Sequence, residues 1–111
     1  LCIVDASGST VVFGSVNEYK SWLKGAHAVN MAYMLSAQLV AMHNNVLAGY
    51  VDGKCVVNDP QLGVVSISTL MAEAVASLCL HPSTPSGSAE RAPQEALKNA
   101  LDRANNNQNW Q

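Results

Sequence analysis

Three cysteines and three histidines are the side chains best suited to chemistry in this sequence, and none of them falls into a known motif. The cysteines stand at positions 2, 55 and 79, so there is no CxxC pair and no spacing typical of zinc ligands. The histidines lie far apart, and none belongs to an HExxH pattern or to a GxSxG nucleophile motif. Cys79 and His81 are two residues apart, which on a helix directs them to different faces. We therefore expect no metal site and no catalytic site.

Acidic and amide side chains near one turn are a second place where chemistry could occur. Asp52, Asn58 and Asp59 could hold a calcium ion, but the ladder of alternating oxygen ligands that ends in Glu is missing. Their preference for turns explains them without a metal. The sequence has no Gly-rich phosphate loop and too few aromatic residues for a base-binding or sugar-binding platform. We predict a non-enzymatic protein without a cofactor; a Cys/His pair formed only by tertiary contact is the alternative.

Composition narrows the classes of partner. The chain has 111 residues, enough for one domain with a single core. Charged residues make up 13%, about half the usual share. Six basic and eight acidic residues give a net charge of −2, so no basic field for nucleic acid is present. Low charge with many neutral polar residues is typical of proteins in assemblies or outside the cell.

The first 25 residues predict a hairpin followed by a short helix. Two β-branched apolar runs flank Ala-Ser-Gly-Ser, which is typical of a β-hairpin from Leu1 to Phe13 with Gly8 at positive φ. Helical spacing begins near Asn17, where Ser15 or Asn17 can serve as the N-cap and Gly25 as the stop.

The stretch from Asn30 to Tyr50 predicts a long amphipathic helix. Its apolar side chains recur at three- and four-residue steps. They are Met31, Met34, Leu35, Leu39, Met42 and Val46. A membrane span needs roughly 18 nearly uninterrupted apolar residues, and polar residues interrupt this stretch too often, so we expect no span. Three methionines on one stripe could also bind a soft metal or a partner, but no His or Cys joins them, and core packing is the better interpretation.

An Asp-Gly pair predicts a second, central hairpin. Asp52 and Gly53 favour a tight turn, and Val51 on one side and Val56 on the other supply its strands. Pro60 and Gly63 then close this segment.

Two further helices complete the expected fold. Apolar periodicity predicts one helix from about Ser66 to Leu80 and another that begins near Pro93, with a Pro- and Ser-rich loop between them. The inward-facing residues of the last helix are Leu97, Leu101 and Ala104. The predicted fold is α+β, with two long helices and a C-terminal helix around one core, an N-terminal β-hairpin and a short central hairpin.

Three blocks of the sequence carry a family resemblance. They read NMAYMLSAQLVAMHNNVLAGYVDG, VSISTLMAEAVASL and QEALKNALDRANNNQN. From about Tyr19 onward the chain resembles a family of bacterial exported and cell-surface proteins that has no assigned catalytic activity. The resemblance implies an extracellular or surface location after removal of a leader. The family's upstream Gly-aromatic-Trp-Asn motif is missing, so residues 1–111 are expected to be one domain that could be the C-terminal part of a longer exported protein.

In an exported protein, the cysteines are expected to oxidise in part. One intrachain disulfide is then expected, with the third thiol free or paired with another chain. We predict that Cys2 pairs with Cys79, which would join the N-terminal strand to the second long helix and leave Cys55 as the free or intermolecular thiol. Three buried thiols in a reducing compartment are the alternative.

Two functions from different classes are compatible with this sequence. The first is an extracellular structural subunit that assembles with copies of itself into a filament or surface layer. The second is a ligand- or cell-binding module of a larger surface protein. The candidate interface residues are Leu1, Ile3, Val4, Tyr50 and Trp110. Trp22 lies on an amphipathic stripe and is expected to be packed instead.

Overall fold

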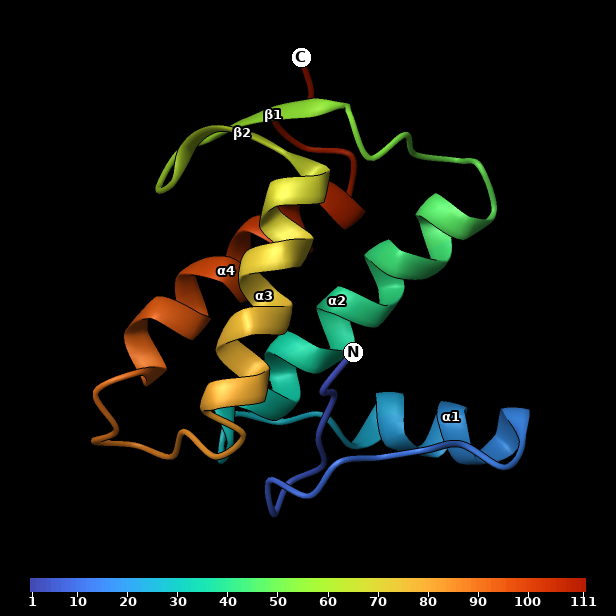
Figure 1. Cartoon of the computed structure of the whole chain (residues 1–111), viewed down its shortest axis with the longest axis vertical. Coiled ribbons are helices and arrows are strands. Elements are labelled where there is room, and N and C mark those ends of the chain that lie inside the picture. Colours follow the sequence, from blue (N-terminus) through green and yellow to red (C-terminus); the bar gives the residue numbers. More distant parts are fainter.

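The computed structural model describes residues 1–111 and confirms the α+β class. Four helices and one antiparallel hairpin follow one another along the chain (Figure 1). Their bounds are α1 Val16–Gly25, α2 Met31–Leu47, β1 Val56–Asp59, β2 Gly63–Ser66, α3 Ile67–Leu80 and α4 Arg91–Asn105. The two long helices and the C-terminal helix predicted from periodicity are therefore present.

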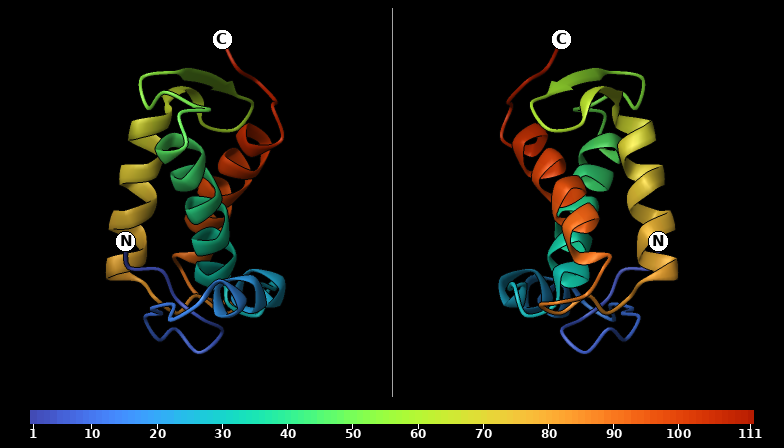
Figure 2. Two further views of the ribbon diagram at one scale, coloured as in Figure 1. Left: turned by 90° about the vertical axis from the view of Figure 1, so that its right-hand side faces the viewer. Right: turned by 90° about the vertical axis from the view of Figure 1, so that its left-hand side faces the viewer.

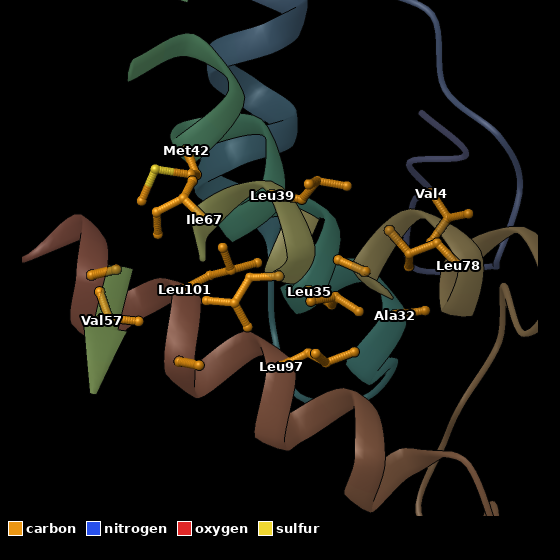
Figure 3. Packing of buried hydrophobic residues seen from close by; sticks show 14 residues of the cluster. Val4, Ala32, Leu35, Leu39, Met42, Val57, Ile67, Leu78, Leu97 and Leu101 are labelled. Atoms are coloured by element: carbon orange, nitrogen blue, oxygen red, sulfur yellow. The ribbon is translucent and has the colours of Figure 1, made fainter. Parts of the chain in front are cut away.

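Helices α2, α3 and α4 lie side by side and enclose the main core. The hairpin crosses one end of these helices, while α1 and the N-terminal segment lie at the other end (Figures 1 and 2). Buried apolar side chains from all three helices meet in the middle, joined by Val4 and Val57 (Figure 3). The main cluster consists of Val4, Ala32, Leu35, Leu39, Met42, Val57, Ile67, Leu70, Ala74, Leu78, Leu97, Ala100, Leu101 and Ala104.

Local capping explains where three of the helices begin. The side chains of Ser15, Asn30 and Ser66 accept hydrogen bonds from backbone N–H groups in the first turns of α1, α2 and α3. Helix α4 has no side-chain cap and begins at Arg91, two residues before the predicted start at Pro93. A proline within the first turn is compatible with this start, because the missing N–H would have no partner inside the helix.

Two of the three predicted core methionines of α2 are buried, and the third is not part of the core. Met31 and Met42 are fully buried, whereas Met34 is half-buried at the surface between α1 and α4. None of the helices is long and apolar enough to cross a membrane.

The second face of α2 packs against an aromatic cluster. Trp22 of α1 lies close to Tyr33 of α2, with ring centroids 5.7 Å apart, and Phe13 and Tyr19 lie on its other sides. The Trp22 indole N–H donates to the carbonyl of Val4 at 2.9 Å, and the Tyr33 hydroxyl donates to the carbonyl of Trp22. Trp22 is thus packed, as expected, and it ties α1 to the N-terminal segment.

The predicted N-terminal hairpin is reduced to one isolated bridge. Val4 and Thr10 form this bridge, around a turn in which Gly8 has φ +84° as predicted. Two backbone hydrogen bonds flank the bridge, from Asp5 N–H to the Ser9 carbonyl and from Val11 N–H to the Ile3 carbonyl. Regular pairing ends at the turn, where the Asp5 side chain accepts the Ser9 N–H, and at Cys2, whose φ is +58°. The Val4 N–H and carbonyl face away from the Thr10 segment and pair with the side chains of Ser36 and Trp22.

The central hairpin exists, but its turn is not at Asp52 and Gly53. The strands pair from Val56↔Ser66 to Asp59↔Gly63, so the reversal occurs at residues 60–62. Side-chain chemistry explains the shift: Asp59 Oδ2 accepts the N–H groups of Gln61 and Leu62, each at 3.0 Å, and so closes the turn. Asp52 instead caps a separate turn by accepting from Lys54 N–H. The C-terminal residues cover the other edge of β1, where Trp110 bridges Val57.

A buried polar network holds the loop before α4 against the start of α2. Asn30, Thr84 and Gln94 are all buried, and each has hydrogen-bond partners. The Thr84 hydroxyl lies 2.6 Å from Gln94 Oε1 and accepts the Ala32 N–H, and the Thr84 N–H donates to Asn30 Oδ1. These bonds hold the loop before α2 and the loop before α4 together, although no helix or strand pairs the two loops.

Substitution Thr84→Val keeps nearly the same side-chain volume and should destabilise the protein. It removes the partner of a buried Gln94 oxygen and one of the two acceptors of the Ala32 N–H, and we expect the unfolding free energy to fall by about 1–3 kcal/mol. Urea unfolding followed by circular dichroism measures this change. Thr10→Val, at an exposed position, is the matched control and should change little. Equal effects of the two substitutions would refute the importance of the network.

Candidate functional site

The histidines and acidic residues do not form a reactive cluster. No group of three or more His, Cys, Asp or Glu side chains lies close enough to hold a metal ion. Only His81 has an acidic neighbour, with its Nε2 atom 3.9 Å from Glu90 at the surface. His27 is exposed, with its ring centroid 5.9 Å from that of Tyr33, and His43 is half-buried.

Cys2 and Cys79 lie at disulfide distance, as the predicted pairing requires. Their Cα atoms are 5.1 Å apart, across 77 positions of sequence. This pair joins the N-terminal segment to the last turn of α3. Cys55 is the remaining thiol and is exposed in the connection between α2 and β1.

Oxidation of this pair should stabilise the chain. Removal of the cross-link by a Cys2→Ser, Cys79→Ser double substitution should lower the unfolding free energy by up to about 4 kcal/mol, because the unfolded chain regains loop entropy. Urea unfolding under non-reducing conditions measures the loss. Cys55→Ser is the control and should have no such effect. Peptide mapping of the non-reduced protein must recover a Cys2–Cys79 linkage; a linkage through Cys55 would contradict the assignment.

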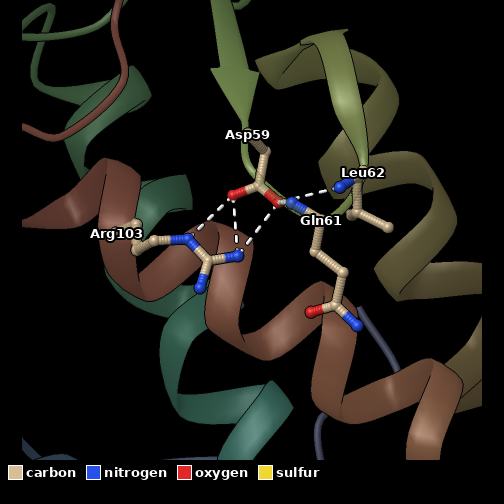
Figure 4. A network of polar contacts seen from close by, with 4 residues as sticks. All are labelled: Asp59, Gln61, Leu62 and Arg103. Carbon is tan, nitrogen blue, oxygen red and sulfur yellow. Dashed lines mark hydrogen bonds and ion pairs between the residues drawn. The ribbon is translucent and has the colours of Figure 1, made fainter.

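One buried ion pair connects the hairpin to α4 (Figure 4). Arg103 donates from Nε to Asp59 Oδ1 and from Nη2 to Asp59 Oδ2, both at 2.9 Å. The Asp59 side chain is 1% exposed and that of Arg103 26%. Burial raises the pKa of the Asp59 carboxyl, but the N–H of Leu62, the Arg103 guanidinium and the N–H of Gln61 outweigh it and hold the pKa below the ordinary 3.8.

This ion pair makes stability dependent on pH. A carboxyl whose pKa is lower in the folded chain stabilises the fold above its unfolded pKa, and this stabilisation is lost as the pH falls toward the folded pKa. We expect Arg103→Gln to lower the unfolding free energy by roughly 2–4 kcal/mol at pH 7 and by less at pH 3. Urea titrations at both pH values test this. Lys98→Gln on the same helix is the control, and the same pH-dependent loss in both variants would refute the interpretation.

An apolar groove lies beside the N-terminal segment and is here called the N-terminal groove. Its volume is about 490 Å³. The lining residues are Leu1, Ile3, Phe13, Gly14, Ser15, Val16, Tyr19, Val40 and Asn44. Leu1 and Val16 are largely exposed, while Ile3 and Tyr19 are half-buried. The groove therefore presents apolar side chains to solvent on a base formed by the aromatic cluster.

Val4 must be removed from the predicted interface residues. Its side chain is 1% exposed and belongs to the main core. Alternation along the N-terminal segment turns Val4 inward, while Leu1 and Ile3 reach the groove. The prediction failed here because it treated the segment as a free strand edge, whereas α2 and Trp22 occupy both backbone groups of Val4.

A second depression of about 190 Å³ brings together three residues that the sequence singled out separately. Tyr50, Cys55 and Trp110 line it, together with Val51 and Asn107. Tyr50 is 82% exposed, whereas the Trp110 indole is half-buried and donates to the carbonyl of Ala104 at 3.1 Å. Trp110 thus closes the end of α4 and forms a wall of this depression. We call it the C-terminal depression.

Sequence reasoning missed several residues that build these surfaces. Phe13, Val16 and Val40 come from three different elements, and no spacing in the sequence links them. Helical periodicity does not single out Arg103, because it carries no signal that a hairpin carboxylate would reach this side chain. Asp59 followed by Pro60 was the visible signal for a structured turn.

Comparisons of the chain with known protein families, with curated proteins and with solved structures found no match. The resemblance to bacterial exported proteins therefore stays a prediction.

Proposed function

We propose that this chain is a non-enzymatic structural protein that acts outside the cell and associates with copies of itself. The observation that carries the proposal is the presence of two separate apolar surfaces, the N-terminal groove and the C-terminal depression. Each is lined by exposed large apolar or aromatic side chains, such as Leu1 and Tyr50. Exposed apolar surface of this kind is typical of contact sites between proteins.

The placement of the two surfaces favours open association. The N-terminal groove lies beside α1, and the C-terminal depression lies near the hairpin and the C-terminus, toward the opposite end of the molecule (Figure 1). Contact between two unlike surfaces of identical chains repeats without closing unless the rotation forms a ring. The proposed assembly is therefore a head-to-tail filament or layer.

Charge and sulfur chemistry support the same proposal. A net charge of −2 on 111 residues gives little repulsion between copies. The Cys2–Cys79 pair at disulfide distance suits an oxidising compartment, and disulfides are rare in the cytosol. Both features support a location outside the cell.

Charge placed in the N-terminal groove should weaken association. Val16→Asp introduces a carboxylate at the first position of α1, where a negative charge stabilises the helix. In a contact between two copies of the chain, the same carboxylate would be buried without a partner. We expect the dissociation constant for self-association to rise about tenfold or more. Light scattering over a dilution series, with negative-stain electron microscopy, measures this effect.

A control of equal exposure is available on the hairpin. Val64 is 66% exposed and Val16 is 67% exposed, and Val64 lines neither surface. Val64→Asp should leave association unchanged. A protein that stays monomeric at every concentration would refute the assembly.

A ligand-binding module is the second candidate. The volume of the N-terminal groove, about 490 Å³, lies within the range of small-molecule sites, about 300–1,000 Å³. A stable monomer whose Trp22 fluorescence responds to an apolar probe, and in which Val16→Asp abolishes that response, would favour this candidate over assembly.

A further inference from the structure

Asp59 and Pro60 form an aspartyl-prolyl peptide bond at the end of β1, and the surroundings of the two residues differ sharply. The Asp59 carboxylate is buried, whereas Pro60 is exposed at the turn. Pro60 carries no N–H, so its nitrogen donates no hydrogen bond. The reactive side chain and the Asp59 residue that carries the attacked carbonyl are thus enclosed, with 2% of the residue exposed, directly before an exposed proline.

An aspartyl-prolyl bond can cleave itself in acid. A side-chain oxygen of the aspartate attacks the carbonyl carbon of its own residue and forms a five-membered cyclic anhydride. The carbon–nitrogen bond breaks, and the proline nitrogen takes a proton from the acidic solvent and leaves as a secondary amine. Water then opens the anhydride, which restores the side-chain carboxyl and leaves a new C-terminal carboxyl group. No oxidant, metal or external nucleophile other than water is required.

The hydrogen bonds of Asp59 oppose the first step. Oδ1 accepts from Arg103 Nε, and Oδ2 accepts from Arg103 Nη2 and from the N–H groups of Gln61 and Leu62. Both candidate nucleophilic oxygens are therefore engaged, and the side chain would have to leave this arrangement before it could attack. Arg103 is the charged group that faces Asp59 from α4, and the two amides are the partners on the hairpin itself.

We propose that the Asp59–Pro60 bond is a latent self-cleavage site and that Arg103 restrains the Asp59 carboxylate from attacking its own main-chain carbonyl. The proposal is independent of self-assembly, because it concerns the chemistry of a single chain. Loss of the restraint would divide the polypeptide into residues 1–59 and 60–111, with both cysteines of the predicted disulfide, Cys2 and Cys79, on different fragments. A cut chain with that disulfide would stay covalently connected until it is reduced.

The test is intact-mass spectrometry of the full chain after incubation in mild acid and reduction. Wild-type protein that circular dichroism shows to be folded should stay uncut, while the same protein unfolded in urea at the same pH should yield fragments 1–59 and 60–111. Folded Arg103→Gln should be cut about tenfold faster or more than folded wild type, the change expected when a hydrogen bond to a charged group no longer opposes the step.

Two matched variants identify the cause. Arg91→Gln also removes an arginine of α4 that donates to backbone carbonyls, those of Thr84 and Ala28, but it does not touch Asp59 and should stay uncut while folded. Adding Pro60→Ala to Arg103→Gln should abolish the cut. Equal cleavage of folded and unfolded wild type would overturn the proposal, even if Arg103→Gln fails to fold. Equal cleavage of folded Arg103→Gln and Arg91→Gln would overturn the role of Arg103.

Discussion

Helix α2 is apolar on two faces, and the other elements are arranged so that both faces are covered. One face contributes Ala32, Leu35, Leu39 and Met42 to the main core beside α3 and α4. The other contributes Tyr33, Ala37 and Val40 to the cluster around Trp22. Since burial of apolar surface is the main favourable term in folding, a helix with two apolar faces requires partners on both sides. The N-terminal segment and α1 supply the second partner, which is why they fold back onto α2.

The connections between elements depend on specific polar and covalent contacts, because they contain little regular structure. The network of Asn30, Thr84 and Gln94 holds the loop before α4, and the Cys2–Cys79 pair holds the first residues of the chain. Asp59 and Arg103 attach the hairpin to α4. Of these contacts, only the Cys2–Cys79 cross-link, when oxidised, would restrict the unfolded chain, because the hydrogen bonds and the ion pair are lost on unfolding.

The same construction leaves apolar groups at the surface. The N-terminal segment and α1, which cover the second face of α2, are short. Leu1 and Val16 therefore remain largely exposed at the margin of this cover and help to form the N-terminal groove. At the other end, the C-terminal residues run beside β1 and bring Trp110 next to Tyr50 and Cys55. With 13% charged residues, the protein has few charged side chains to repel neighbouring molecules from these apolar surfaces. The proposed self-association follows from this combination of packing and composition.

The sequence by itself determined the helices and much of the core, because these features depend on neighbours three or four residues away. It located α3 within one residue, and it identified Leu97, Leu101 and Ala104 as buried. The reversal at residues 60–62 also rests on local contacts, since the Asp59 carboxylate accepts the N–H groups of Gln61 and Leu62. Tertiary structure alone decided that the same carboxylate pairs with Arg103 and that the backbone groups of Val4 pair with Ser36 and Trp22. The burial of Val4 and the assembly of both apolar surfaces likewise depend on residues from separate elements, and local spacing carries no information about which distant side chains will meet.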